Sequence, residues 1–187
     1  SEVQQRQMTT SNAQNVHTIA VEGTFDDCQN IVKEMFKHPA FREDVKLSGV
    51  NSINWARIMN QVVYYFTSAL SLGAPDREVS FCVPTGNFGD IFAGFVAKKM
   101  GLPVDKLIIA TNENDILKRM CDTGRYEMRG VTSTSSPSMD IQISSNFERL
   151  LFEANGRDTN AINNCMNSLK QSGSFEVSPS AMKLITQ

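Results

Sequence analysis

The sequence predicts a three-layer α/β fold built around a parallel βαβ unit. Residues 79–83 form a short apolar, β-branched run, which is typical of a buried strand. From Asp90 onward apolar side chains recur at helical spacing, and a second apolar run, 106–111, follows that helix. Two strands that flank a helix in this way are expected to lie parallel. With 187 residues, 41% of them hydrophobic, the chain can bury one substantial core, so we expect a single segment over 1–187.

The first part of the chain is predicted to contain one strand and one helix. Residues 1–15 are mostly polar and form a lead-in with no clear element. Residues 16–21 alternate well enough for a strand. An amphipathic helix is then expected up to Lys37, with Thr24 or Asp26 as its N-cap.

A longer helix is predicted over residues 51–72, after a loop with a short strand at 41–50. Its apolar stripe indicates that one side is buried. The stripe consists of Trp55, Met59, Val62, Val63, Phe66, Ala69 and Leu70. Gly-Leu-Pro at 101–103 is expected to end the helix that starts near Asp90.

Beyond the second strand the periodicity weakens. A helix is expected over 112–119, and a loop over 123–138, which is rich in Gly, Ser and Thr. Ser145 is predicted to cap a helix that runs to Ala154. Residues 155–187 carry weaker patterns, of a further helix and then a turn with a short strand or helix.

The composition argues against several classes of function. A net charge of −2 argues against nucleic-acid binding, which needs a basic patch. No apolar run reaches the length of a membrane span. The four cysteines are dispersed and there are only two histidines, so we expect no metal site. Cys28 and Cys82 fall in apolar patterns and are predicted to be buried, reduced thiols of a cytoplasmic protein.

The loop after the first strand is one candidate site. Pro84 ends the strand, and the residues that follow are Thr85, Gly86, Asn87, Phe88 and Gly89. A loop with two glycines before a helix can turn its N–H groups toward one point, beside the positive end of the helix dipole. Thr85 adds a hydroxyl donor. The pattern is neither a Walker loop nor the dinucleotide fingerprint, and from the residues alone it fits an anion site or a plain β-to-α turn.

The start of the helix at 51–72 is the second candidate site. Asn51 and Ser52 fall in the cap region. Asn54 and Arg57 lie three positions apart, on one face of the helix. Amide, hydroxyl and guanidinium groups at a helix N-terminus form a receptor for a phosphate dianion. The same residues also fit a capped helix with an ordinary surface arginine.

Four stretches of the chain are distinctive. They are Val-Glu-Gly-Thr-Phe-Asp-Asp-Cys-Gln at 21–29, Asn-Ser-Ile-Asn-Trp-Ala-Arg at 51–57, Pro-Thr-Gly-Asn-Phe-Gly-Asp at 84–90 and Ser-Pro-Ser-Met-Asp-Ile at 136–141. In this order they resemble blocks of the threonine synthase family, pyridoxal-phosphate enzymes of fold type II related to tryptophan synthase β. The resemblance extends over about residues 3–152. It implies that the βαβ unit is part of a fold type II enzyme.

The resemblance implies two phosphate sites. The loop would hold the phosphate of the cofactor, pyridoxal phosphate, through Thr85, Gly86, Asn87, Phe88 and Gly89. Asn51, Ser52 and Arg57 would hold the phosphate of the substrate, O-phosphohomoserine. In the family's reaction this phosphate leaves the γ carbon, water adds at the β carbon, and threonine is released.

The resemblance also implies that one functional group is missing. In the family the Schiff-base lysine stands in a Phe-Lys-Asp context ahead of the matched blocks, and no lysine of this sequence has that context. The chain is therefore predicted to be an internal segment with no catalytic residue of its own, inactive when isolated. A homologous phospho-lyase that converts the same substrate to 2-ketobutyrate is one alternative. A non-catalytic phosphate-binding domain is the other.

Overall fold

The computed structural model describes residues 2–23, 25–49 and 53–186. The chain divides into two compact units, with the boundary between residues 48 and 49. Among the described residues, no helix is long and apolar enough to cross a bilayer.

The N-terminal unit is helical over much of its described length. Its helices are α1 (Glu2–Thr9), α2 (Phe25–Lys37) and α3 (Pro39–Asp44). Helix α2 confirms the helix predicted up to Lys37. Helix α1 lies in the lead-in for which no element was expected.

Two predictions for this unit are wrong. Residues 16–21 form no strand, and Ile19 is 82% exposed. A strand needs a partner for its backbone N–H and C=O groups, and the described residues of this unit contain no other strand. The loop and strand expected at 41–50 are replaced, over the described part, by α3 and a turn, because Pro39 has the fixed φ that suits a first helical turn.

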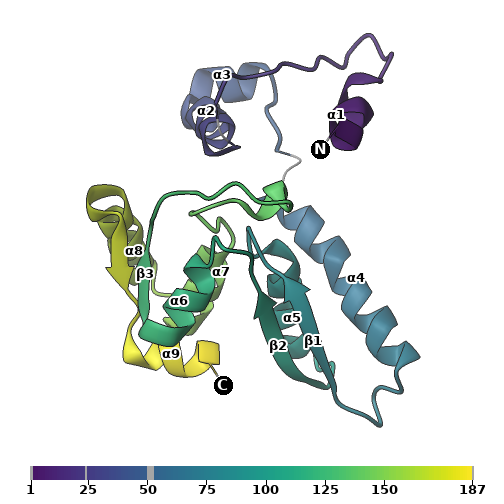
Figure 1. Ribbon diagram of the computed structural model, residues 1–187, viewed down its shortest axis with the longest axis vertical. Helices are drawn as coiled ribbons and strands as arrows, with labels where there is room; N and C mark the ends of the chain where they lie inside the picture. Colours follow the sequence, from purple (N-terminus) through teal and green to yellow (C-terminus); the bar gives the residue numbers. More distant parts are fainter. Residues whose placement is uncertain (1, 24, 50–52, 187) are drawn as a thin grey trace. The chain divides into compact units, whose positions relative to one another are not determined.

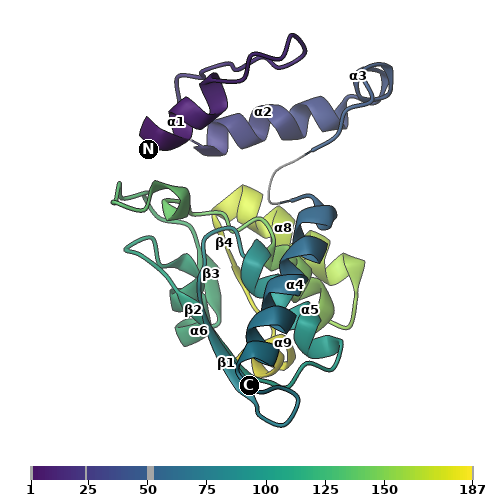
Figure 2. The same cartoon turned by 90° about the vertical axis from the view of Figure 1, so that its right-hand side faces the viewer.

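The C-terminal unit is built on a parallel strand pair and two helices. They are α4 (Trp55–Ser71), β1 (Val79–Pro84), α5 (Gly89–Lys99) and β2 (Val104–Ala110). The strands β1 and β2 are parallel, with Val83 paired to Ile109, which confirms the predicted βαβ unit and the α/β class. Helix α5 connects the strands, and α4 packs against it (Figure 2). The loop from β1 to α5 lies at the carboxyl end of a parallel strand, where open α/β sheets bind ligands.

Burial alternates along β1. Val79 and Val83 are buried, whereas Cys82 is exposed. The prediction that Cys82 is a buried thiol is therefore wrong, because it lies on the opposite face of the pleat from Val83. Cys28 is only partly buried.

Helix α4 buries a narrower face than its sequence suggests. Its buried side chains are Ile58, Val62, Tyr65 and Ala69. Met59, Val63 and Leu70, all in the predicted stripe, are 52%, 55% and 58% exposed. The helix carries apolar residues on two faces, and periodicity alone does not show which of them meets α5.

The rest of the unit is mainly helical, with a second small sheet (Figure 1). Its helices are α6 (Ile116–Thr123), a 3-10 turn (Pro137–Met139), α7 (Phe147–Ala154), α8 (Thr159–Ser172) and α9 (Pro179–Thr186). Strands β3 (Arg125–Glu127) and β4 (Ser174–Glu176) pair antiparallel. Strand β3 lies in the segment expected to be a loop. It is too short to show a pattern, and its partner follows only after the 3-10 turn and helices α7 and α8.

Candidate functional site

The loop between β1 and α5 is fixed at both ends. The Thr85 N–H donates to the carbonyl oxygen of Ala110 on β2, at 2.8 Å. Phe88, at the N-cap of α5, has a left-handed backbone with φ 64°, a conformation that is uncommon for a bulky residue and that clusters at functional sites. Its side chain is buried against Phe147, with ring centroids 5.4 Å apart. The core therefore holds this turn in place.

A segment just before α7 holds the carbonyl groups of the loop. Ser144 Oγ donates to the carbonyl oxygen of Gly86 at 2.7 Å. The backbone N–H and the side-chain Nδ2 of Asn146 both donate to the carbonyl oxygen of Asn87, at 2.9 and 3.0 Å. The N–H groups of residues 86–89, in contrast, have no acceptor among the residues that the structure describes. Unpaired N–H groups at the start of a helix favour a bound anion.

A cavity of about 340 Å³ lies beside these N–H groups. The loop, the first turn of α5, Arg57 and Gln61 of α4, and Ser138 and Met139 line it. Among the described residues of this lining, Arg57 is the one cation and Asp90 the one carboxylate, and none is a lysine. Loop N–H groups, a helix N-terminus and a guanidinium together suit a phosphate group.

The structure brings together most of the predicted site residues. Arg57 and all five loop residues line the same cavity. Asn51 and Ser52 lie outside the described residues. The N-cap of α4 is Asn54, whose Oδ1 accepts from the Ala56 N–H at 2.9 Å, so the cap falls later than predicted.

Thr85 lines the cavity but already uses its hydroxyl. The side chain is 5% exposed, and Oγ1 donates to the carbonyl oxygen of Val83 at 2.6 Å. For the hydroxyl to bind an anion, as predicted, this bond has to break. The N–H groups of residues 86–89 need no such change.

Gly86 lies at a close contact between two backbone segments. A Cβ at this position would lie 3.3 Å from the carbonyl oxygen of Ser138 and 3.4 Å from Met139 Cα. Both neighbours are backbone atoms, so they cannot move aside as a flexible side chain does. Residues 138 and 139 thus form a wall over the loop, and glycine lets the two segments meet.

Asp140 anchors this wall. The sequence pattern did not indicate this role, because Asp140 stood out only as a member of the fourth distinctive stretch. Its carboxylate accepts from Thr134 Oγ1 at 2.7 Å and the Thr134 N–H at 2.8 Å. It also accepts from Asn112 Nδ2 at 2.7 Å and Asn114 Nδ2 at 3.1 Å. Hydrogen bonds from Thr134, then from Asn112, lower the pKa of Asp140. The carboxylate therefore stays ionised and ties residues 137–139 to the end of β2.

Tyr65 joins α4 to the first turn of α5. Its hydroxyl donates to the carbonyl oxygen of Asp90 at 2.9 Å and lies 3.2 Å from Asp90 Oδ1. Burial, with the Asp90 carboxylate beside it, raises the pKa of Tyr65 well above its ordinary value. Tyr65 therefore remains a hydrogen-bond donor at any physiological pH, and it sets the position of α4, which carries Arg57, relative to the loop.

The predicted cap of α7 is wrong. The N-cap is Asn146, without a side-chain cap bond, and Ser145 Oγ donates instead to Asn87 Oδ1 at 3.2 Å. Ser145 thus stabilises the loop rather than the start of α7. Sequence spacing could not indicate this, because the two residues are 58 positions apart.

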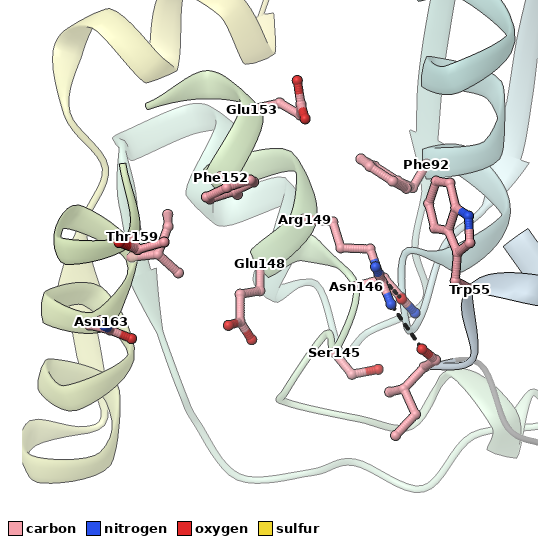
Figure 3. A pocket seen from close by; sticks show the side chains of 12 residues that line it. Trp55, Phe92, Ser145, Asn146, Glu148, Arg149, Phe152, Glu153, Thr159 and Asn163 are labelled. Atoms are coloured by element: carbon pink, nitrogen blue, oxygen red, sulfur yellow. Dashed lines mark hydrogen bonds between the residues drawn. The ribbon is translucent and has the colours of Figure 1, made fainter. Parts of the chain in front are cut away.

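A second cavity, of about 680 Å³, opens between α4, α5, α7 and α8 (Figure 3). Trp55, Phe92, Glu148, Arg149 and Asn163 are among its lining residues. The described residues of its lining offer no loop of unpaired N–H groups, so the smaller cavity is the better phosphate site although the second is larger. Across the described residues, no group of three or more His, Cys, Asp or Glu side chains could hold a metal ion.

Known proteins resemble the chain over almost its full length. No model of a protein family matches the sequence. The threonine synthase of Pseudomonas aeruginosa is 57% identical over 177 residues, which are 95% of this chain and 38% of that protein. The threonine synthase of Saccharomyces cerevisiae is 51% identical, over 98% of this chain and 38% of that protein.

Solved structures agree with the sequence comparison. The PLP-bound threonine synthase of Brucella melitensis has a TM-score of 0.88 and 69% identity, over 99% of this chain and 40% of that one. The yeast enzyme has a TM-score of 0.81 and 51% identity. The chain therefore has the fold of the matching part of these enzymes, and it spans about two-fifths of the length of the relatives it matches.

Proposed function

We propose that this chain, which is homologous to threonine synthases over nearly its whole length, forms the phosphate-binding part of a threonine synthase. The whole protein converts O-phosphohomoserine and water to L-threonine and phosphate, with pyridoxal phosphate as cofactor. One observation carries the proposal: the unpaired N–H groups of residues 86–89 and the Arg57 side chain line one cavity. The Brucella melitensis structure, which contains PLP, supports the choice of cofactor.

The loop fits the phosphate of the cofactor. Its N–H groups supply several donors at the positive end of α5, and Gly86 leaves room for residues 138 and 139 to close over them. When bound, pyridoxal phosphate supplies an electron sink for carbanions at the substrate. The role of the loop is to hold that group at one end, in a fixed orientation.

Arg57 fits the phosphate of the substrate. Its guanidinium can donate two parallel bonds to a phosphate group, and it lines the loop's cavity from a different helix. Asn51 and Ser52 add an amide and a hydroxyl at the start of the same segment. These groups orient the substrate and stabilise the negative charge of the phosphate as it leaves.

Three further points belong to the proposal. Water addition is favoured over elimination to 2-ketobutyrate because relatives at 51–57% identity are threonine synthases. The chain alone is inactive, because no lysine in it has the Phe-Lys-Asp context of the family. The four free cysteines support a cytoplasmic location, where thiols remain reduced.

Kinetics of Arg57 variants in the whole protein test the substrate assignment. We expect Arg57→Gln to raise KM for O-phosphohomoserine at least about tenfold at saturating pyridoxal phosphate, since it loses about 1.4 kcal/mol or more of charge-assisted binding. Arg77→Gln is the matched control, because Arg77 is an exposed arginine of the same unit that does not line the cavity. An unchanged KM in Arg57→Gln would remove Arg57 from the substrate site.

A further inference from the structure

Arg149, near the start of α7, makes three contacts that fix its guanidinium. Nε donates to Asn146 Oδ1 at 3.0 Å, and Nη2 donates to the carbonyl oxygen of Ile53 at 2.8 Å. The guanidinium also lies over the ring of Trp55, 5.5 Å from its centroid. Figure 3 shows Arg149 beside Asn146 and Trp55. The side chain therefore holds the residues that lead into α4.

Asn146 continues the connection to the loop. It is fully buried, and it gives both its N–H and its Nδ2 to the carbonyl oxygen of Asn87 while its Oδ1 accepts from Arg149. An unbroken path of hydrogen bonds thus runs from Ile53 through Arg149 and Asn146 to Asn87. Buried polar networks whose members all have partners are rigid and hold one geometry.

The two ends of this path belong to the two phosphate sites. Ile53 stands between Ser52 and Arg57 in sequence, at the entry to α4, and Asn87 is the centre of the loop. We infer that Asn146 and Arg149 are positioning residues that set the distance between the substrate-phosphate segment and the cofactor-phosphate loop. This inference rests on the proposed function. It assigns a role to two residues that do not line the cavity beside the loop.

The spacing matters for the reaction. The substrate is held by its phosphate group, and the cofactor is held by its own phosphate group. The distance between the two sites therefore decides where the substrate's reacting carbons lie relative to the cofactor. A displacement of about 1 Å in such a geometry can cost about a hundredfold in rate. A rigid link between the two sites is therefore of direct use to the enzyme.

Three single variants of the whole protein separate the two ends of the link. We expect Arg149→Gln, which removes the bond to the Ile53 carbonyl, to raise KM for O-phosphohomoserine about tenfold. We expect Asn146→Ala, which removes the Nδ2 bond to the Asn87 carbonyl and the acceptor of Arg149 but keeps the backbone N–H bond, to raise the Kd of pyridoxal phosphate by about the same factor. The control is Arg157→Gln, because the side chain of Arg157 is 70% exposed and pairs with Glu153 on the surface. It should leave KM and Kd unchanged.

The double variant Asn146→Ala, Arg149→Gln distinguishes a connection between the two sites from two independent effects, one at each site. A link also requires Arg149→Gln alone to raise the Kd of pyridoxal phosphate. In an Asn146→Ala background the same change should raise this Kd no further, since the path from Arg149 to the loop is already cut. Independent effects would multiply instead. Effects that multiply, or variants that lower the unfolding temperature but leave KM and Kd as in the wild type, would overturn the inference.

Inorganic phosphate separates failure of this inference from failure of the proposed function. If the wild-type protein takes up no pyridoxal phosphate in a spectroscopic titration, the proposed function fails. Calorimetric titration with inorganic phosphate then tests the link alone. Binding that Arg149→Gln and Asn146→Ala each weaken about tenfold supports the link. Equal affinity in these variants, or no phosphate binding by the wild type, contradicts it.

Discussion

Replacement of Gly86 by valine is the sharpest perturbation of the loop. A Cβ at this position already lies 3.3 and 3.4 Å from backbone atoms of Ser138 and Met139, and valine adds two methyl groups beyond it. The loop or the wall must therefore retreat, and at least one N–H group leaves the phosphate. A hydrogen bond to a charged group contributes about 1.5–3 kcal/mol. Loss of one such bond raises the Kd of pyridoxal phosphate about 10- to 150-fold, since 1.4 kcal/mol is a factor of ten.

The assay is a spectroscopic titration of the whole protein with pyridoxal phosphate, without substrate. Gly130→Val is the matched control, because a Cβ at Gly130 meets nothing within 4 Å. Thermal unfolding of both variants identifies any general loss of structure. A Kd for Gly86→Val within about twofold of the wild type, which is less than about 0.5 kcal/mol, would refute the reasoning that this loop binds the cofactor's phosphate.

Three further outcomes follow from the structure. Tyr65→Phe removes the donor to Asp90 and should lower the free energy of unfolding by about 1 kcal/mol in denaturant titrations at neutral pH. Because the folded-state pKa of Tyr65 is raised, its contribution is complete below the ordinary tyrosine pKa of about 10 and is lost at higher pH, so wild type and variant should converge in stability there. The pKa of Asp140 is lowered, so its contribution is present above the ordinary pKa of about 3.9 and lost on acidification. Asp140→Asn should accordingly unfold at a lower temperature than wild type at pH 7, and this difference should shrink as the pH falls below about 3.9, in scanning calorimetry. The chain expressed alone should release no threonine from O-phosphohomoserine, and activity that one lysine substitution abolishes would contradict that expectation.

Sequence patterns predicted those elements of the fold whose residues lie close together in the chain. The strand at 79–83, the turn after Pro84 and the helix from Asp90 follow each other within twenty residues, and each has its own signal. The βαβ unit and the place of the five loop residues between β1 and α5 were therefore predictable. Arg57 could be placed at the same site only through the family resemblance, because its spacing fits a surface arginine as well.

The remaining features depend on contacts between distant residues. Ser144 and Asn146 hold the loop from 58 and 59 positions away, and no periodicity indicates such a bond. Strand β3 exists because β4 pairs with it, whereas residues 16–21 have a strand-like pattern and no partner among the described residues of their unit. A segment without a strand pattern can thus form a strand when a partner strand is present, and a segment with a strand-like pattern can fail to form one when no partner is present.

Product analysis of the whole protein tests the central claim most directly. The protein is incubated with pyridoxal phosphate and O-phosphohomoserine, and threonine, 2-ketobutyrate and phosphate are measured together. A threonine synthase releases threonine and phosphate in equal amounts, with the signal dependent on added pyridoxal phosphate. Release of phosphate with 2-ketobutyrate in place of threonine, or no release of phosphate from protein that has bound the cofactor, would contradict the account.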